Sequence, residues 1–189
     1  MTAPDQPVSP HDARAVANLL LKLAQAKGLS VTNLSLQKLI YFAHGLMLRR
    51  HGRSLVDGYF EAWDYGPVHP LLYSCFKTAG RSPIAHPALK RDLRRGLLGP
   101  VEMDADAEAE GVVSEVLDAL GHQPAGRLVR MSHARGGPWH EVVNKSGTVS
   151  GLGLRISDSL IRDRFHRHLV TVGSADDRIG EAFDESPPA

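Results

Sequence analysis

The segment from Leu34 to Arg50 constrains the fold of this chain most, because it is the most apolar part of the sequence. It follows Asn33, a residue type that caps helices, and precedes Gly52, a residue type that ends them. Projected at about 100° per residue, its apolar positions form one wide stripe, as a central core helix requires. The stripe consists of Leu36, Leu39, Ile40, Ala43, Leu46 and Met47.

Further helices are predicted on both sides of this segment. The first, from Pro10 to Lys27 after a Ser9 cap, has an apolar face of Val16, Leu19, Leu20, Leu23 and Ala24. Leu21 falls on the opposite, polar face with Asn18 and Lys22, so we expect it to be exposed and available to a partner. Other helical patterns cover 104–120, 124–131, a brief stretch after Trp139, and 158–169 after a Ser157 cap.

The β signals are short. Tyr59 to Trp63 predicts a strand that Gly66 and Pro67 end, and a helix is expected from His69 or Pro70 to about Thr78. Between residues 80 and 100 we expect an irregular connection with one short strand or a hairpin. The prediction is therefore a mainly α domain (α+β with minor β) over residues 10–170, between disordered tails at 1–9 and 171–189, the latter acidic.

Composition restricts the setting and the partners. The 189 residues carry a formal net charge of +1, so the overall balance gives no reason to expect nucleic acid or an anionic membrane as partner. Cys75 is the single cysteine and can form no intramolecular disulfide. Residues 1–10 lack the pattern of a signal peptide, and charged residues or histidine interrupt every apolar stretch. We therefore expect a cytoplasmic protein with no membrane span.

No complete catalytic, cofactor or metal motif is visible. His166 and His168 are two positions apart, which on a helix points them in nearly opposite directions. Gly151 and Gly153 lack the third glycine and the preceding strand of a dinucleotide site. Ser132 and His133 are adjacent but have no nucleophile elbow around them. We therefore predict no enzyme activity, no cofactor and no metal.

Two groups of polar residues stay open to more than one interpretation. Gln37, Tyr41 and His44 lie on one side of the central helix and must find partners, either as a hydrogen-bonded scaffold or as a ligand site that includes nearby Trp63, Asp64 and Tyr65. The basic run that contains Arg91 and Arg94 fits a solvated surface, a protein-binding surface or a phosphate-binding one.

Three stretches in order resemble one known family, the Panacea domain of SocA-type antitoxins. They are Leu36-Gln37-Lys38-Leu39-Ile40-Tyr41-Phe42-Ala43-His44-Gly45, Phe60-Glu61-Ala62-Trp63-Asp64-Tyr65-Gly66-Pro67-Val68, and Ser132-His133 with Gly137-Pro138-Trp139. The final 156–165 helix completes the pattern, so the resemblance spans about residues 13–169. It implies a compact Panacea-like domain of several helices with a few short strands, and a protein toxin as partner.

The resemblance also implies a mechanism. SocA-type antitoxins are proteolytic adaptors that present a toxin, an inhibitor of the replication sliding clamp, to the protease ClpXP through ClpX, whereas other Panacea antitoxins are thought to neutralise toxins directly. The motif positions then serve as scaffold or toxin-facing residues: Gln37, Tyr41, His44, Trp63, Asp64, Tyr65, His133 and Trp139. Leu21, Arg91 and Arg94 are candidates for a partner surface.

Three hypotheses of different classes follow. The first is an adaptor that grips the toxin with one face and reaches the protease through a tail or a second surface. The second is a DNA-binding autoregulator that uses basic side chains on phosphates, and nucleic acid is the less favoured partner. The third is a hydrolase that uses His133 or His44, which ranks last.

Overall fold

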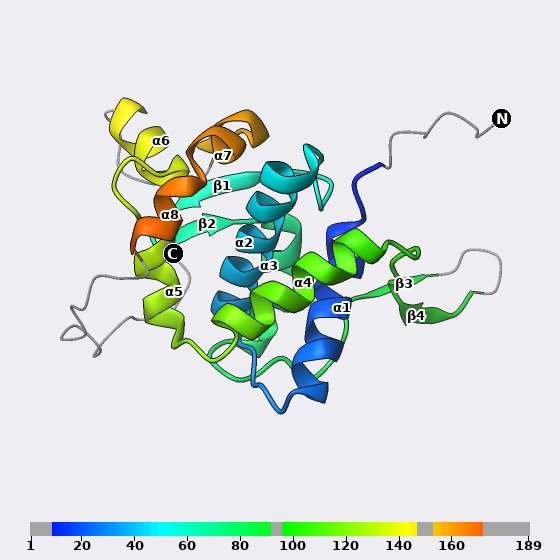
Figure 1. The fold of residues 1–189 in the computed structure, drawn as a ribbon. Coiled ribbons are helices and arrows are strands. Elements are labelled where there is room, and N and C mark those ends of the chain that lie inside the picture. Colours follow the sequence, from blue (N-terminus) through cyan, green and yellow to red (C-terminus); the bar gives the residue numbers. More distant parts are fainter. Residues whose placement is uncertain (1–8, 92–95, 147–152, 172–189) are drawn as a thin grey trace, which may run out of the picture.

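The fold was analysed in a computed structural model that describes residues 9–91, 96–146 and 153–171. The predicted tails therefore lie almost wholly outside the described residues. The prediction of a mainly α fold with a few short strands is confirmed (Figure 1). The helices are α1 (Ala13–Ala26), α2 (Asn33–His51), α3 (Pro70–Phe76), a 3-10 turn η1 (Lys77–Ala79), α4 (Ala107–Leu120), α5 (Ala125–Ser132), α6 (Pro138–Ser146), α7 (Asp158–Arg164) and α8 (His166–Thr171).

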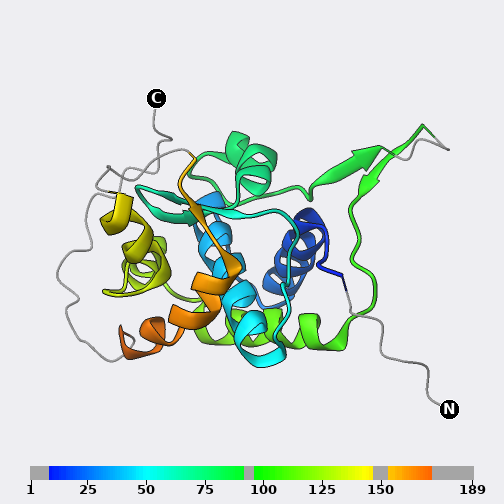
Figure 2. The ribbon, with the colours of Figure 1, turned by 90° about the horizontal axis from the view of Figure 1, so that it is seen from above.

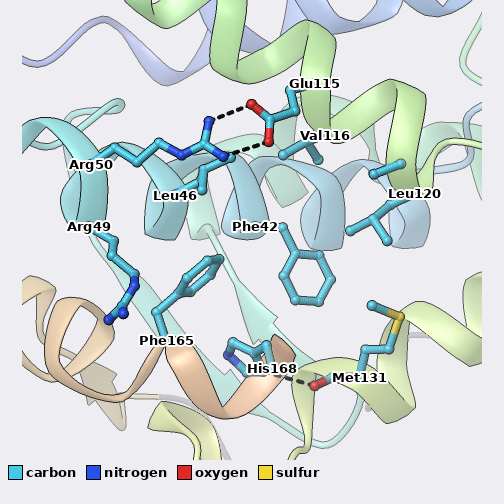
Figure 3. A pocket seen from close by; sticks show the side chains of 11 residues that line it. Phe42, Leu46, Arg49, Arg50, Glu115, Val116, Leu120, Met131, Phe165 and His168 are labelled. Carbon is cyan, nitrogen blue, oxygen red and sulfur yellow. Dashed lines mark hydrogen bonds and ion pairs between the residues drawn. The ribbon is translucent and has the colours of Figure 1, made fainter. Parts of the chain in front are cut away.

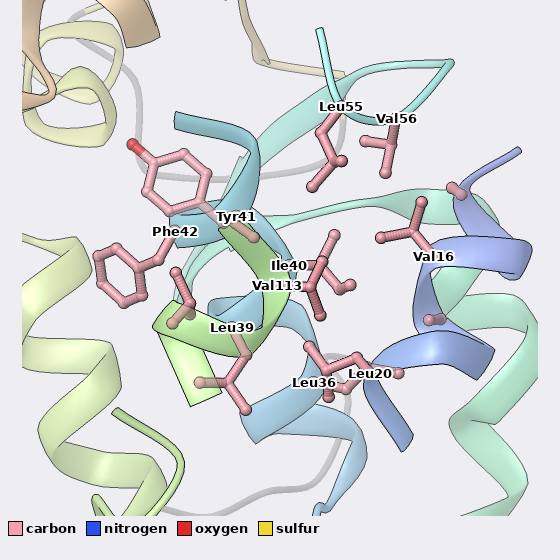
Figure 4. Close-up of a cluster of buried hydrophobic side chains, with 14 of the residues drawn as sticks. Val16, Leu20, Leu36, Leu39, Ile40, Tyr41, Phe42, Leu55, Val56 and Val113 are labelled. Atoms are coloured by element: carbon pink, nitrogen blue, oxygen red, sulfur yellow. The ribbon is translucent and has the colours of Figure 1, made fainter. Parts of the chain in front are cut away.

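Helix α2 is the centre of the molecule, as its apolar stripe predicts. Helices α1, α4, α5 and α7 all pack against it. Figure 4 shows Leu36, Leu39 and Ile40 of α2 meeting side chains of α1 and α4 in one cluster. The N-cap is Thr32, whose hydroxyl accepts a hydrogen bond from the Ser35 N–H. The expected Asn33 cap is thus wrong by one residue. Burial also reaches polar positions of this helix, since Gln37, Lys38 and His44 are buried beside its apolar stripe.

Two small antiparallel sheets accompany the helices. Strands β1 (Phe60–Trp63), β2 (Gly66–Val68) and β5 (Arg155–Ile156) form the first sheet in the order β2-β1-β5. Strands β3 (Leu89–Arg91) and β4 (Leu98–Pro100) pair with each other as a hairpin and form the second sheet. This hairpin projects away from the helices beyond α1 (Figure 2). The expectation of a hairpin between residues 80 and 100 is therefore met.

The structure corrects two predictions about α1. Its N-cap is Asp12, whose carboxylate accepts from the Arg14 N–H at 2.9 Å, so the expected start at Pro10 is wrong. Residue 11 is instead held in an extended bridge beside Val56. Leu21, expected to be exposed, is partly buried against the core. The segment 83–87 runs beside that face of α1, which a helical projection of α1 alone does not show.

The final helix is two helices rather than one. The Ser157 cap is confirmed, since its hydroxyl accepts from the Leu160 N–H. The chain then tightens at Phe165, where the His168 N–H bonds the Phe165 carbonyl three residues back. This turn lets the buried Phe165 ring and the buried His168 ring both face α2. Packing, which the local sequence does not encode, decides this break.

Gly45 lets α2 and the Phe165 ring approach closely. A Cβ at Gly45 would overlap two ring carbons of Phe165. Alanine ordinarily stabilises a helix interior over glycine by up to about 1 kcal/mol. We expect Gly45→Ala to lower the unfolding free energy by about 1–2 kcal/mol instead, because overpacking outweighs propensity. Urea denaturation measures this change.

The matched control for Gly45→Ala is Gly111→Ala in α4, where a Cβ meets nothing within 4 Å. That variant should gain stability by up to about 1 kcal/mol. Equal effects of the two substitutions would contradict the close approach of Phe165 to α2.

Candidate functional site

The polar residues on one side of α2, Gln37, Tyr41 and His44, are buried. Each bonds to a different part of the chain. The Gln37 Oε1 accepts from the His69 backbone N–H at 2.8 Å. The Tyr41 hydroxyl bonds the His168 Nε2 at 3.1 Å, and the His168 Nδ1 donates to the Met131 carbonyl at 2.9 Å. Because Nδ1 of His168 is the donor, its Nε2 accepts and Tyr41 donates. Burial lowers the pKa of His168 to about 4 and raises that of Tyr41, so both are neutral.

His44 joins α2 to α7 and to the loop before β1. Its Nδ1 accepts from the Val56 N–H at 3.4 Å, which leaves its Nε2 to donate to the Asp158 carboxylate at 3.1 Å. Ser54 bonds the second oxygen of Asp158. With both ring nitrogens engaged, His44 is placed to hold α7 against α2.

A second buried cluster gathers around Gly66, at the start of β2. Lys38 of α2 is fully buried, and its Nζ donates to the Pro67 carbonyl at 2.7 Å. A Cβ added at Gly66 would overlap the Ser132 Oγ and lie 3.2 Å from the Lys38 Nζ and 3.3 Å from the His133 Nε2. Three of the sequence motifs therefore meet at this one point. Burial lowers the pKa of Lys38 to about 7.

The aromatic residues of the motifs close this cluster on the α6 side. The His133 ring stacks on Trp139, with centroids 3.8 Å apart. The Trp139 Nε1 donates to the Trp63 carbonyl at 2.8 Å, and the Trp63 Nε1 donates to the Glu61 carboxylate at 2.7 Å. Burial, and then the charge of Lys38, lower the pKa of His133 to about 4. The motif residues thus join α2, α5, α6 and the β1–β2 turn.

Ser132, His133 and Lys38 are residue types used in nucleophilic catalysis, but their setting is an interior one. Ser132 is fully buried, and its hydroxyl donates to the Val129 carbonyl at 2.8 Å. Lys38 is equally inaccessible and already bonded. A nucleophile needs a substrate within reach, so this geometry favours a scaffold over a reacting centre. Within the described ranges, no group of three or more His, Cys, Asp or Glu side chains is placed to hold a metal ion.

The remaining candidates from the sequence are distributed over the surface. Asp64 is exposed and Tyr65 is partly buried in the turn between β1 and β2. Arg91 is exposed on β3, whereas Arg94 lies outside the described residues. The structure therefore does not bring Leu21, Arg91 and the motif residues into one site. No helix in the described ranges is long and apolar enough to cross a membrane.

An apolar groove lies between α2, α4, α5 and α8, and no sequence pattern predicted it. Its volume is about 350 Å³, at the lower end of the range of small-molecule sites. Figure 3 shows the rings of Phe42, Phe165 and His168 at its floor, with Arg49 at its edge. The further lining residues are Leu46, Arg50, Glu115, Val116, Ala119, Leu120 and Met131. Leu46, expected within the core stripe, is only partly buried because it borders this groove.

The β3–β4 hairpin is a second surface feature. Three leucines on it are strongly exposed: Leu89 by 48%, Leu97 by 65% and Leu98 by 63%. Lys90 and Arg91 on β3 are also exposed. The sequence had indicated only the basic residues of this region. The adjacent Leu97 and Leu98, directly after the basic run, were the signal that could have pointed to an apolar surface.

Comparison with known proteins gives two matches and one negative result. The sequence model of the family "Antitoxin SocA-like, Panacea domain" matches residues 36–140. A curated relative, "Antitoxin SocA" of Caulobacter vibrioides (strain NA1000 / CB15N), is 47% identical over 178 residues, which is 94% of each of the two chains. No solved structure matches the chain.

Proposed function

Because this chain belongs to the SocA-like antitoxin family with a Panacea domain, we propose that it binds a cognate protein toxin and delivers it to the protease ClpXP. The antitoxin role rests on family membership. The delivery step is the finer part of the proposal, with ClpX as the second partner. As the resemblance to SocA-type antitoxins implies, the toxin is expected to inhibit the replication sliding clamp.

The observation that carries the proposal is the extent of the similarity. The 47% identity extends over 94% of both chains, well beyond the matched domain of residues 36–140. A likeness restricted to the domain would support only a common core. Similarity over the whole length supports a common way of using the surface.

An adaptor must contact two proteins at once, and the described structure offers two separate surfaces. The hairpin projects beyond α1, whereas α5 and α8, which line the groove together with α2 and α4, lie across α2 from the hairpin (Figure 1). Simultaneous contact raises the effective concentration of the toxin at the protease without tight binding at either surface. Each surface is tied to the folded body by a hydrogen bond: Tyr41 of α2 bonds His168 at the groove, and Asn18 of α1 bonds Ala88 and Val101 at the hairpin base.

The decisive experiment starts by asking whether a reading frame next to this chain's own encodes a small protein. If that protein is the toxin, it should arrest growth when expressed alone and be harmless with the antitoxin. In a purified system with ClpXP and ATP, adding this chain should shorten the half-life of the toxin by about tenfold or more, because tethering supplies a high local concentration. Gel densitometry over time measures the half-life.

Three further measurements discriminate between the mechanisms. If the antitoxin still neutralises the toxin in cells without ClpX, the mechanism is direct inhibition and not delivery to the protease.

Removal of residues 1–8 or 172–189 tests whether either terminal segment contributes to the tether. Unchanged degradation of the toxin with both truncated chains would exclude the termini from the mechanism. Leu46→Gln places an amide at the groove wall and tests whether the groove contacts either partner.

A further inference from the structure

The groove between α2, α4, α5 and α8 offers an occupant few polar groups. The His168 ring at its floor has both nitrogens engaged, one with the Tyr41 hydroxyl and one with the Met131 carbonyl. Arg50 and Glu115 at the α2–α4 wall are paired with each other, with an Nη2–Oε1 distance of 2.7 Å. The remaining lining is mostly apolar (Figure 3). An occupant is therefore held chiefly through its apolar side chains.

Among the described residues that line the groove, one charged side chain is still available. The Arg49 side chain is exposed, and its guanidinium forms no ion pair with any residue that the structure describes. Figure 3 places it at the edge of the groove, beside Phe165 and away from the Arg50–Glu115 pair. An unpaired cation beside an apolar surface favours an occupant that combines apolar side chains with carboxylates.

Residues 172–189 of this chain have that combination of side chains. They carry five acidic residues and one basic residue, Arg178. Their two largest apolar side chains, Ile179 and Phe183, are four positions apart. Positions four apart share a face both in a helix and in an extended strand, so both side chains can enter one groove. Acidic segments with few apolar residues gain order by binding to a surface, so the composition of this segment suits such a role.

The segment also begins close to the groove. Helix α8 ends at Thr171, about one turn beyond His168, which lies at the groove floor. Ile179 follows Thr171 by eight residues, and an extended chain of that length spans up to about 28 Å. The covalent link keeps the segment near the groove at an effective concentration in the millimolar range. A dissolved partner or a second copy at micromolar concentration competes poorly with it.

We propose that residues 172–189 bind in this groove of their own chain, with Ile179 and Phe183 against its apolar walls and a neighbouring carboxylate paired with Arg49. The inference goes beyond the proposed function, because it gives the groove an occupant from within the chain. A partner that uses the groove must first displace this segment, so the segment regulates access to that surface. Binding within one chain is tested without any partner, so its failure would leave the proposed function untouched.

The experiment follows Phe183 in the full-length chain labelled with 4-fluorophenylalanine. Fluorine NMR gives a signal for each phenylalanine, and Phe183→Leu identifies the signal of Phe183. A soluble gadolinium chelate broadens the signals of exposed rings, so the Phe183 signal of the unaltered chain should broaden several-fold less than that of a free peptide of residues 172–189. Ala119→Glu, at an exposed position that lines the groove, should remove this protection, because it narrows the groove and repels carboxylates. Arg49→Glu should reduce the protection for the second of these reasons.

The matched control is Ala107→Glu, which introduces the same carboxylate at an exposed position at the other end of α4. It should leave the Phe183 signal protected. Thermal melting should be the same in all three glutamate variants, because each alters an exposed residue. The inference is overturned if the Phe183 signal of the unaltered chain broadens as fully as that of the peptide, or if it stays protected in both Ala119→Glu and Arg49→Glu. Protection that is lost on dilution would also overturn it, because the segment of a second copy would then fill the groove.

Discussion

Gly66→Ala should lower the free energy of unfolding by roughly 2–6 kcal/mol, a large part of the stability of a domain of this size. Two costs add. Gly66 has a φ of +92°, a conformation that costs a residue with a Cβ about 1–3 kcal/mol. The new Cβ would also overlap the Ser132 Oγ in a fully buried cluster, and overpacking of this kind costs about 1–3 kcal/mol.

The measurement is urea denaturation followed by tryptophan fluorescence, since Trp63 and Trp139 both adjoin this cluster. Gly28→Ala is the control, because Gly28 has a φ of +69° but open space around it. It should lose only about 1 kcal/mol, the backbone cost alone. Adding Ser132→Ala to Gly66→Ala should restore part of the loss by removing the overlap. If Gly66→Ala and Gly28→Ala are equally destabilised, the close meeting of the three motifs at Gly66 is refuted.

Lys38 should make the stability of the protein rise with pH in the alkaline range. Burial lowers the pKa of Lys38 from its ordinary value of 10.5 to about 7 in the folded chain. Between these two pH values the unfolded chain holds a proton that the folded chain has released. Raising the pH therefore favours the folded chain, and the gain is complete only above the unfolded pKa. The shift corresponds to roughly 3–5 kcal/mol over the whole window.

The test compares the unfolding free energy at several pH values from 7 to 10 with that of Lys38→Met. Both proteins should carry Cys75→Ser, so that the thiol, whose pKa is raised by partial burial, adds no pH dependence of its own. The chain that retains Lys38 should gain stability by several kcal/mol relative to Lys38→Met as the pH rises. Parallel curves for the two proteins would show that the Lys38 ammonium is not buried.

The Gly66→Ala and Lys38→Met experiments both address the role of the motif residues. Gln37, Tyr41, His44, His133 and Trp139 make their principal contacts inside the molecule. We therefore expect substitutions among them to act on toxin binding mainly through the stability of the fold. A toxin-facing role for the motif stays a prediction that measurements of toxin binding test.

Local patterns in the sequence determined the helices and most of the core. The apolar period of α2 identified the central helix, and Ser157 identified the start of α7, because periodicity and capping depend on residues within a few positions of one another. The ordered motifs determined the family, and family membership in turn supports the antitoxin role. The same patterns placed Leu21 on the surface, since a projection of one helix contains no information about the segment beside it.

Only the tertiary structure decided which residues meet. Tyr41 bonds His168, 127 positions away, and Asn18 fixes a hairpin base 70 and 83 positions away. Nothing in the spacing of Lys38 distinguishes it from a solvated lysine, yet packing of α5 and β2 over α2 encloses it. Residues so far apart in the sequence meet because whole helices and strands pack together. The sum of many contacts determines that packing, and no local sequence pattern encodes it. The exposed leucines on the hairpin arise in the same way, because the helices close their core without them.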